Sequence, residues 1–203
     1  TGTSIAVTLT GTRFGSVSNE RVIATYGTNG TNYKAANCSV TIAESEIVCY
    51  SVPGGGANHT WRVSTTATVW SPFSDTHTSY TAPRIMEVRW NSTQAGAESV
   101  QQKYLDTRGR ETLTITGKNF GPRVAFIDLL TLGGRELGSK SNPLCTITVP
   151  HSEIQCDTLP GTGASHFLRL KIRGQKASCR NETETCTLSY YAPRIDRVTG
   201  PSG

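Results

Sequence analysis

The residues with the clearest chemistry in this sequence are its six cysteines. Cys38 and Cys49 are eleven residues apart, and the same spacing separates Cys145 from Cys156. This spacing suits cysteines on neighbouring antiparallel strands, and a third pair brackets a short polar loop: Cys179 and Cys186. An even number of cysteines that pair within each part of the chain indicates three disulfide bonds.

A zinc site is the alternative use of these cysteines. The sequence has no C-x2-C motif, and its four histidines are not spaced as ligands, so we expect disulfides and no metal. Asp and Glu are dispersed, which gives no sign of a calcium-binding loop. Because disulfides persist in oxidising compartments, the protein is expected outside the cytosol.

Asparagine-linked glycosylation is the second chemistry that the sequence offers. The acceptor pattern Asn-x-Ser/Thr, with x other than proline, occurs at Asn29, Asn37, Asn58, Asn91 and Asn181. All five fall in expected loops or at expected strand edges. We therefore expect covalent N-linked glycans and a route through the secretory pathway to the cell surface or the extracellular space.

Catalytic chemistry is not indicated. His59 and His166 follow the glycine-rich turns Gly54–Gly56 and Gly161–Gly163, but no second titratable partner recurs with them. We interpret them as packing or surface residues, and the chain as a non-enzyme without a cofactor. The two turns lack the Lys-Ser/Thr and the helix of a phosphate-binding loop. Sugar binding through an aromatic side chain stays open for Trp61, Trp70 and Trp90, although Trp61 is expected in the core.

The charge of the chain is modest, at +5 from 20 Lys and Arg and 15 Asp and Glu. The basic residues are scattered without aromatic residues between them, which favours an ordinary solvated surface over a nucleic-acid interface. No apolar run approaches the roughly 18 residues that a membrane-spanning helix needs. The chain is therefore not expected to cross a membrane itself.

The sequence contains two copies of one pattern. Five blocks recur in the same order, 106 to 110 residues apart. The paired blocks begin at Gly11 and Gly117, Cys38 and Cys145, Ser45 and Ser152, Pro53 and Pro160, and Ser79 and Ser189. We expect domain 1 at residues 1–85, a linker with a first strand and an insertion at 86–111, domain 2 at 112–193, and a further segment at 194–203.

Each copy has the patterning of a β fold. Ile5–Thr10 and Thr112–Thr116 alternate apolar residues with threonine, which is typical of strands with one buried face. His59–Val69 and Phe167–Ile172 show the same alternation, and no ten-residue stretch has a convincing helical period. With 20 glycines and 9 prolines marking turns, the sequence predicts two tandem seven-stranded β-sandwiches.

These blocks resemble a known family. Leu9–Gly15 (LTGTRFG) and Ile115–Gly121 (ITGKNFG) are similar to the opening of IPT/TIG domains, and both copies close on Tyr-x-Ala-Pro-x-Ile, at Tyr80–Ile85 and Tyr190–Ile195. The paired cysteines and the Pro-Gly-x-Gly turn also match that layout. The resemblance implies an immunoglobulin-like fold. Its members include plexin-like receptors, accessory modules of carbohydrate-acting enzymes, transcription factors and long surface proteins.

The segment 194–203 repeats the exit from domain 1. Arg194, Ile195 and Val198 match Arg84, Ile85 and Val88, which lead into domain 2. We interpret 194–203 as the first strand of a following domain, which would make the chain one period of a longer repeat array. Alternatively, it is a strand donated without a covalent link to the next copy, in contact with Ile5 and Val7. The sequence thus predicts head-to-tail partners of the same kind in an extracellular filament or surface coat, a structural glycoprotein. The alternative is a ligand-binding ectodomain fragment of a plexin-like receptor or adhesin.

The linker between the domains carries an insertion that the second junction lacks. It includes Trp90-Asn91-Ser92-Thr93 and Gln101-Gln102-Lys103-Tyr104-Leu105. A loop of this length is usually functional or without fixed structure. Trp90 and Tyr104 either make a lateral contact with another molecule or pack back over domain 2. The sequence is compatible with both interpretations.

Glycan occupancy gives a direct test of the predicted compartment. Treating the protein from its native source with a glycosidase that converts glycosylated Asn to Asp is expected to change at least three of the five sequon asparagines. Peptide mass spectrometry measures the conversion site by site. Unmodified asparagine at all five sequons would contradict the prediction.

Overall fold

The fold is described from a computed structural model, which covers residues 4–18, 21–66, 68–91, 104–141, 144–181 and 185–200. The structure is nearly all β, with 47% of residues in strands and 2% in helices. In these described ranges, no helix has the length and apolar character needed to cross a membrane. The insertion residues Ser92, Thr93 and Gln101–Lys103 lie outside the described ranges.

The first six strands form two small sheets, which we call the first unit. One sheet has the order β1-β5-β4 and the other β3-β2-β6, all pairs antiparallel. The strands are β1 (Ala6–Thr10), β2 (Ile23–Gly27), β3 (Tyr33–Lys34), β4 (Ala36–Ile42), β5 (Glu46–Tyr50) and β6 (Thr60–Ser64). Alternate residues of β2, β5 and β6 are buried, as the period of a strand with one core face requires.

The remaining strands form two larger sheets, the second unit. Their orders are β12-β13-β9-β7-β16 and β11-β10-β14-β17-β8, with β15 beside β14. The elements are β7 (Arg84–Asn91), β8 (Tyr104–Leu105), β9 (Thr112–Lys118), the 3-10 turn η1 (Val124–Phe126), β10 (Ile127–Leu132), β11 (Arg135–Gly138), β12 (Cys145–Val149), β13 (Glu153–Asp157), β14 (His166–Ile172), β15 (Gln175–Lys176), β16 (Ser178–Cys179) and β17 (Thr187–Tyr190).

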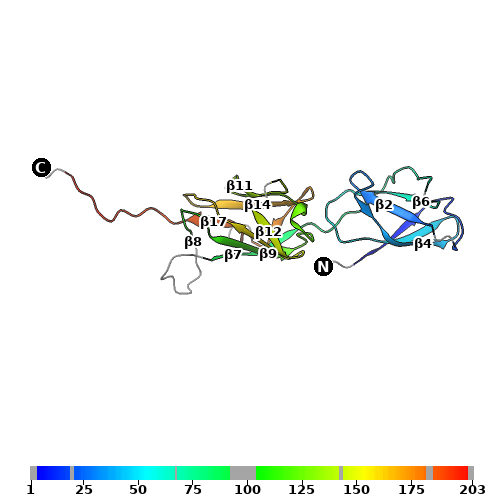
Figure 1. The fold of residues 1–203 in the computed structure, drawn as a ribbon, viewed down its shortest axis with the longest axis horizontal. Coiled ribbons are helices and arrows are strands. Elements are labelled where there is room, and N and C mark those ends of the chain that lie inside the picture. Colours follow the sequence, from blue (N-terminus) through cyan, green and yellow to red (C-terminus); the bar gives the residue numbers. More distant parts are fainter. Residues whose placement is uncertain are drawn as a thin grey trace.

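Each unit has its own hydrophobic core, and the two units lie end to end (Figure 1). The core of the first unit contains Tyr26, Ile47 and Trp61, so Trp61 lies in the core as expected. The core of the second unit draws side chains from both of its sheets, including Ile115 of β9 and Leu130 of β10. The described chain therefore builds two pairs of facing sheets.

The boundary expected at residue 85 divides strand β7. Arg84 and Ile85 already pair with Lys118 and Gly117 of β9, and Ile85 is fully buried in the second core. The chain thus leaves the first unit before Arg84. The strand begins this early because the side chain of Ile85 packs in the core of the second unit.

One expected strand is shorter than its sequence pattern. The alternation from His59 to Val69 predicted a long strand, but β6 ends at Ser64. The chain then folds back along β6, where Ser71 N–H donates to the carbonyl of Val63 and the hydroxyl of Ser74 accepts from the N–H of Trp61. This segment covers the β6 edge with side-chain hydroxyls, so no regular strand forms there.

Three disulfides join the cysteine pairs that the spacing predicted. Cys38–Cys49 links β4 to β5, and Cys145–Cys156 links β12 to β13 at directly opposed residues. The third bond joins Cys179, at the end of β16, to Cys186. The two equivalent disulfides tie the same hairpin in each unit, and bonds of this kind indicate an oxidising compartment.

The two units repeat an unusual turn as well as their strands. Arg13 and Asn119 occupy equivalent positions and both have φ of 64°, a left-handed conformation that few non-glycine residues adopt. Two residues later each copy has a glycine, Gly15 or Gly121. The carbonyl of Gly15 accepts a hydrogen bond from the N–H of Glu44, and the carbonyl of Gly121 accepts one from the N–H of His151. Backbone equivalence at such restricted positions supports residue-by-residue comparison of the two units.

A two-residue strand completes one end of the second unit. β8 runs parallel to β17, and the carbonyl of Leu105 accepts a hydrogen bond of 3.0 Å from the N–H of Tyr191. Leu105 is fully buried, whereas Tyr104 beside it is 38% exposed. The first unit has no strand at the corresponding place among its described residues.

Leu105→Ala is expected to lower the free energy of unfolding of the second unit by about 2–5 kcal/mol, because it leaves a cavity in the core. Tyr104→Ala is the matched control on the same strand, with an expected loss of about 1 kcal/mol from its exposed ring contact with Tyr191. Urea unfolding of the two variants measures the difference. Equal losses would show that β8 does not fill the core.

Candidate inter-copy interface

The open edge of β1 is the main feature that separates the first unit from the second. β1 pairs only with β5 in the described chain, whereas its counterpart β9 lies between β13 and β7. The N–H of Gly11 donates to the carbonyl of Ser45 on the β5 side. Because an antiparallel ladder alternates, the N–H and C=O groups of Ala6, Thr8 and Thr10 point to the open side.

The opposite edge of the same sheet carries features that oppose strand addition. β4 has register shifts between Ala36 and Ser39 and between Val40 and Ile42. Asn37 lies on this strand with φ of 46°, is exposed, and carries a glycosylation sequon. Bulges and bulky groups at an edge prevent pairing with another chain, so β1 is the edge of this sheet available for a partner.

The missing neighbour leaves part of the first core incompletely covered. Leu113 and Ile115 of β9 are fully buried. Their equivalents 106 residues earlier, Val7 and Leu9 of β1, are only half-buried. Ile5, which precedes the strand, is 65% exposed. The first unit therefore exposes apolar surface at the place where the second unit has β7.

Residues 194–200 share Arg, Ile and Val with β7, as Arg194, Ile195 and Val198, but they make no strand contact in the described chain. This segment extends away from the second unit at the end remote from the first (Figure 1), and every residue in it is exposed. Ile195 is 80% exposed and Val198 83%, whereas Ile85, the equivalent of Ile195, is fully buried. Arg194 forms an ion pair of 2.7 Å with Asp196, both well exposed to solvent.

The pairing of β7 with β9 gives a register for an equivalent pairing of 194–200 with β1. Ile85 lies opposite Gly117, and Val88 opposite Ile115. The repeat offsets convert these pairs into Ile195 opposite Gly11, Val198 opposite Leu9 and Gly200 opposite Val7. The third pair differs in kind, because Gly200 stands where β7 has Trp90.

Gly117 and Asn119 show how the second unit receives its first strand. A side chain at position 117 would collide with the carbonyl oxygen of Arg84, so glycine is needed for the close approach of β7. The Asn119 side chain donates a hydrogen bond of 3.0 Å to the carbonyl of Ala82. In the first unit, Gly11 is the equivalent of Gly117 and likewise has no side chain that would block an incoming strand. Arg13 is the equivalent of Asn119, and its longer side chain can also donate hydrogen bonds at the open edge.

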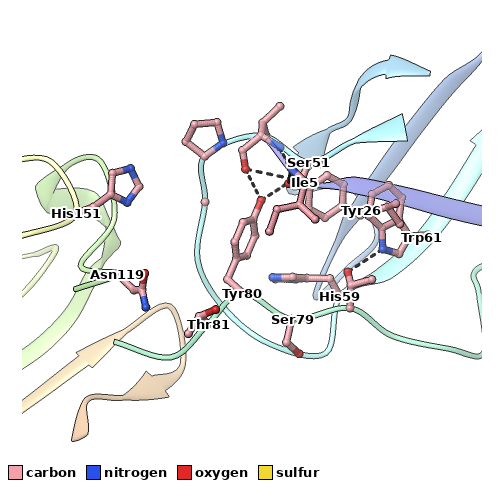
Figure 2. A pocket seen from close by; sticks show the side chains of 15 residues that line it. Ile5, Tyr26, Ser51, His59, Trp61, Ser79, Tyr80, Thr81, Asn119 and His151 are labelled. Atoms are coloured by element: carbon pink, nitrogen blue, oxygen red, sulfur yellow. Dashed lines mark hydrogen bonds between the residues drawn. The ribbon is translucent and has the colours of Figure 1, made fainter. Parts of the chain in front are cut away.

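A cavity of about 310 Å³ lies beside the start of β1, at the end of the first unit that meets the second (Figure 2). Side chains of the first unit line most of it, with Asn119 and His151 contributed by the second. The lining residues include Ile5, Val7, Ser51, His59, Ser79 and Thr81. In the second unit, fully buried Leu105 lies beside Tyr190 of β17, and Tyr190 is the repeat equivalent of Tyr80 in the cavity wall.

An aromatic cluster forms the deep wall of this cavity. Tyr26 stacks on Trp61 with ring centroids 4.2 Å apart, and its hydroxyl lies 2.5 Å from that of Tyr80. Burial raises the pKa of both tyrosines, so both stay protonated at physiological pH. Tyr80 also donates to the carbonyl of Val52, which fixes the loop before the glycine-rich turn.

Each of the two repeated histidines packs against tyrosine within its own unit. His59 is 2% exposed and meets Tyr26, Tyr33 and Tyr80 edge-on. Burial lowers its pKa, which keeps the ring neutral at physiological pH. His166 meets Tyr190 in the same way, and its Nε2 lies 2.8 Å from the carbonyl of Thr162. The structure brings no pair of these groups into a nucleophile–base arrangement.

The other predicted site residues lie on the surface. All five sequon asparagines are exposed: Asn29, Asn37, Asn58, Asn91 and Asn181. Trp90 packs partly against the second core, and its indole N–H donates to the carbonyl of Tyr104. This contact favours the reading in which the described part of the insertion packs back over the second unit. Tyr104 and Tyr191 form an exposed ring pair.

No protein-family model matches this chain, and no curated protein gives a significant match. The cavity was not found from the sequence, whereas strand addition in contact with Ile5 and Val7 was one of the expectations from the sequence.

Native-state hydrogen exchange is expected to distinguish the two equivalent strands in the isolated chain. The N–H groups of Thr112, Thr114 and Thr116 face β7 and should exchange at least about tenfold more slowly than those of Ala6, Thr8 and Thr10. Fragment-resolved mass spectrometry or NMR measures the rates. Similar protection on both strands would contradict an open β1 edge.

Proposed function

We propose that this chain is a structural glycoprotein whose copies add head to tail into an extracellular filament or surface coat. The observation that carries the proposal is that the strand edge of β1 is open while the segment 194–200 is exposed and repeats the Arg-Ile-x-x-Val pattern of β7, which pairs at the equivalent edge. Residues 194–200 of one copy pair with β1 of the next. Such strand addition satisfies main-chain groups that otherwise depend on water.

The energetics of this contact combine side-chain burial with backbone pairing. Burying Ile195 and Val198 contributes about 1.5–3 kcal/mol each, and each new backbone hydrogen bond about 0.5–1.5 kcal/mol. Ordering the segment costs about 1–2 kcal/mol per residue. The two apolar side chains therefore supply a large part of the favourable free energy that offsets the cost of ordering the segment.

The proposal is an open filament and not a closed ring, because the donated segment leaves the second unit at the end remote from the first (Figure 1). The donating segment and the accepting edge lie on different units, so the contact is heterologous, and a heterologous contact that does not close produces an open fibre. Each unit is then an immunoglobulin-like sandwich of the IPT/TIG type, stacked along the fibre. The three disulfides and the exposed sequons fit an extracellular rod with attached N-linked glycans.

Hydrogen bonds between the two units of one chain indicate how a stiff rod could form. The side chain of Gln175 accepts a hydrogen bond from the N–H of Gly56 and donates one of 2.9 Å to the carbonyl of Tyr80. Asn119 binds Ala82 on the other side of the connection. Contacts on two sides of a short connection restrict bending between the units.

Charge placed on the buried face of the donated segment is expected to abolish fibres. Ile195→Asp combined with Val198→Asp puts two carboxylates where the first core needs apolar side chains, a change that no hydrogen bond compensates. Electron microscopy and light scattering on the purified chain measure fibre length. For the unmodified chain we expect an axial repeat of roughly 70–100 Å, from typical domain dimensions.

The matched control places charge on the opposite face of the same segment. Arg197→Asp with Thr199→Asp adds the same two carboxylates at positions equivalent to Glu87 and Arg89, both exposed in β7. This control is expected to keep its fibres. Fibres in both variants would contradict strand donation, and isolated particles of the unmodified chain at all concentrations would favour the receptor or adhesin fragment instead.

A further inference from the structure

We propose that the cavity beside β1 is a second docking site for the donated segment, filled by the residues that follow Gly200 in the neighbouring copy. This inference rests on the proposed head-to-tail assembly and extends it. Strand addition along β1 completes one sheet of the first unit. The cavity lies at the edge of the other sheet, so its occupant completes the second sheet at the same joint.

The second unit supplies the template for this second contact. After pairing along β9, its chain crosses to the other sheet, where β8 runs parallel to β17. Leu105 enters the core there, and its carbonyl accepts the hydrogen bond from Tyr191. One incoming segment thus contributes to both sheets, first beside β9 and then beside β17.

The first unit keeps the receiving groups of this template, and none of its described residues occupies them as β8 does in the second unit. Ser79, Tyr80 and Thr81 are the repeat equivalents of Ser189, Tyr190 and Tyr191. The N–H of Tyr80 donates to Gly56 just as that of Tyr190 donates to Gly163. The N–H of Thr81, the equivalent of the Tyr191 donor, has no hydrogen-bond acceptor in the described chain, and Thr81 lines the cavity.

The register along β1 brings the donated segment to this cavity. Val198 opposite Leu9 and Gly200 opposite Val7 direct the chain toward Ile5, and both Val7 and Ile5 line the cavity. Gly200 is the last described residue, and the sequence continues with Pro201, Ser202 and Gly203. The occupant is therefore the next part of the same donated segment, and a small molecule would need a separate route past it.

Filling the cavity would also affect the joint between the units. Asn119 and His151 of the second unit face the cavity across from Ser79 and Thr81 of the first (Figure 2). An occupant held between these walls contacts both units of the receiving copy. Docking at one end of a copy would thus hold the angle between its two units, which makes the joint stiffer in the fibre than in the free chain.

The test uses the full chain carrying Ile195→Asp and Val198→Asp, which accepts a strand but cannot donate one. Two synthetic peptides serve as donors, one with the sequence of residues 194–200 and one with that of residues 194–203. Hydrogen exchange is measured at Ala6, Thr8 and Thr10 of β1 and at Thr81. The N–H of Tyr191, already bonded to Leu105, is the internal control and is expected to stay slow throughout.

Both peptides are expected to slow exchange along β1, and only the longer one is expected to slow the Thr81 N–H, by at least about tenfold. A peptide of the same ten residues in scrambled order should protect neither site. Protection of β1 by the longer peptide with unchanged exchange at Thr81 would overturn the cavity proposal and leave the head-to-tail assembly standing. Failure of both peptides to protect β1 would overturn the assembly and the cavity proposal together.

Discussion

The backbone hydrogen bonds on the outer side of one strand are the interaction on which the rest of this structure depends. A β-sheet edge presents N–H and C=O groups that must find partners in the chain, in solvent or in another molecule. In the second unit β7 supplies these partners to β9, and the chain reaches β9 only after passing through β7. The first unit has the same receiving surface on β1 and receives no strand there from the described chain.

The neighbouring structure keeps the receiving edge in shape while it is open. Cys38–Cys49 ties β4 to β5, so the strand that supports β1 is covalently held in its hairpin. The left-handed turn at Arg13 ends β1 as the turn at Asn119 ends β9, with the N–H of Phe14 bonded to the carbonyl of Glu44. A preorganised edge loses little conformational entropy on binding, which favours addition of a short segment.

Two of the glycosylation sequons lie at strand edges that have no partner strand in the proposed fibre. Sequons lie on the far edge of the first sheet at Asn37 and at the end of β7 at Asn91, both exposed. Glycans at these positions would shield strand edges that have no partner in the proposed fibre. Residues 194–203 contain no sequon, so the donated segment would carry no N-linked glycan.

The sequence by itself determined the β class, the internal repeat, the three disulfide pairs and the equivalence of 194–198 with 84–88. These features follow from residue type and spacing along the chain, as with the eleven-residue interval that places Cys145 opposite Cys156. Only the tertiary structure decided that Ile85 belongs to the second core, that β6 ends at Ser64, and that a cavity stands where the other unit has Leu105. Each of these depends on which segment lies beside which in space. The sequence of one strand does not contain that information. Its alternation of apolar and polar residues is the same whether or not another strand is paired beside it.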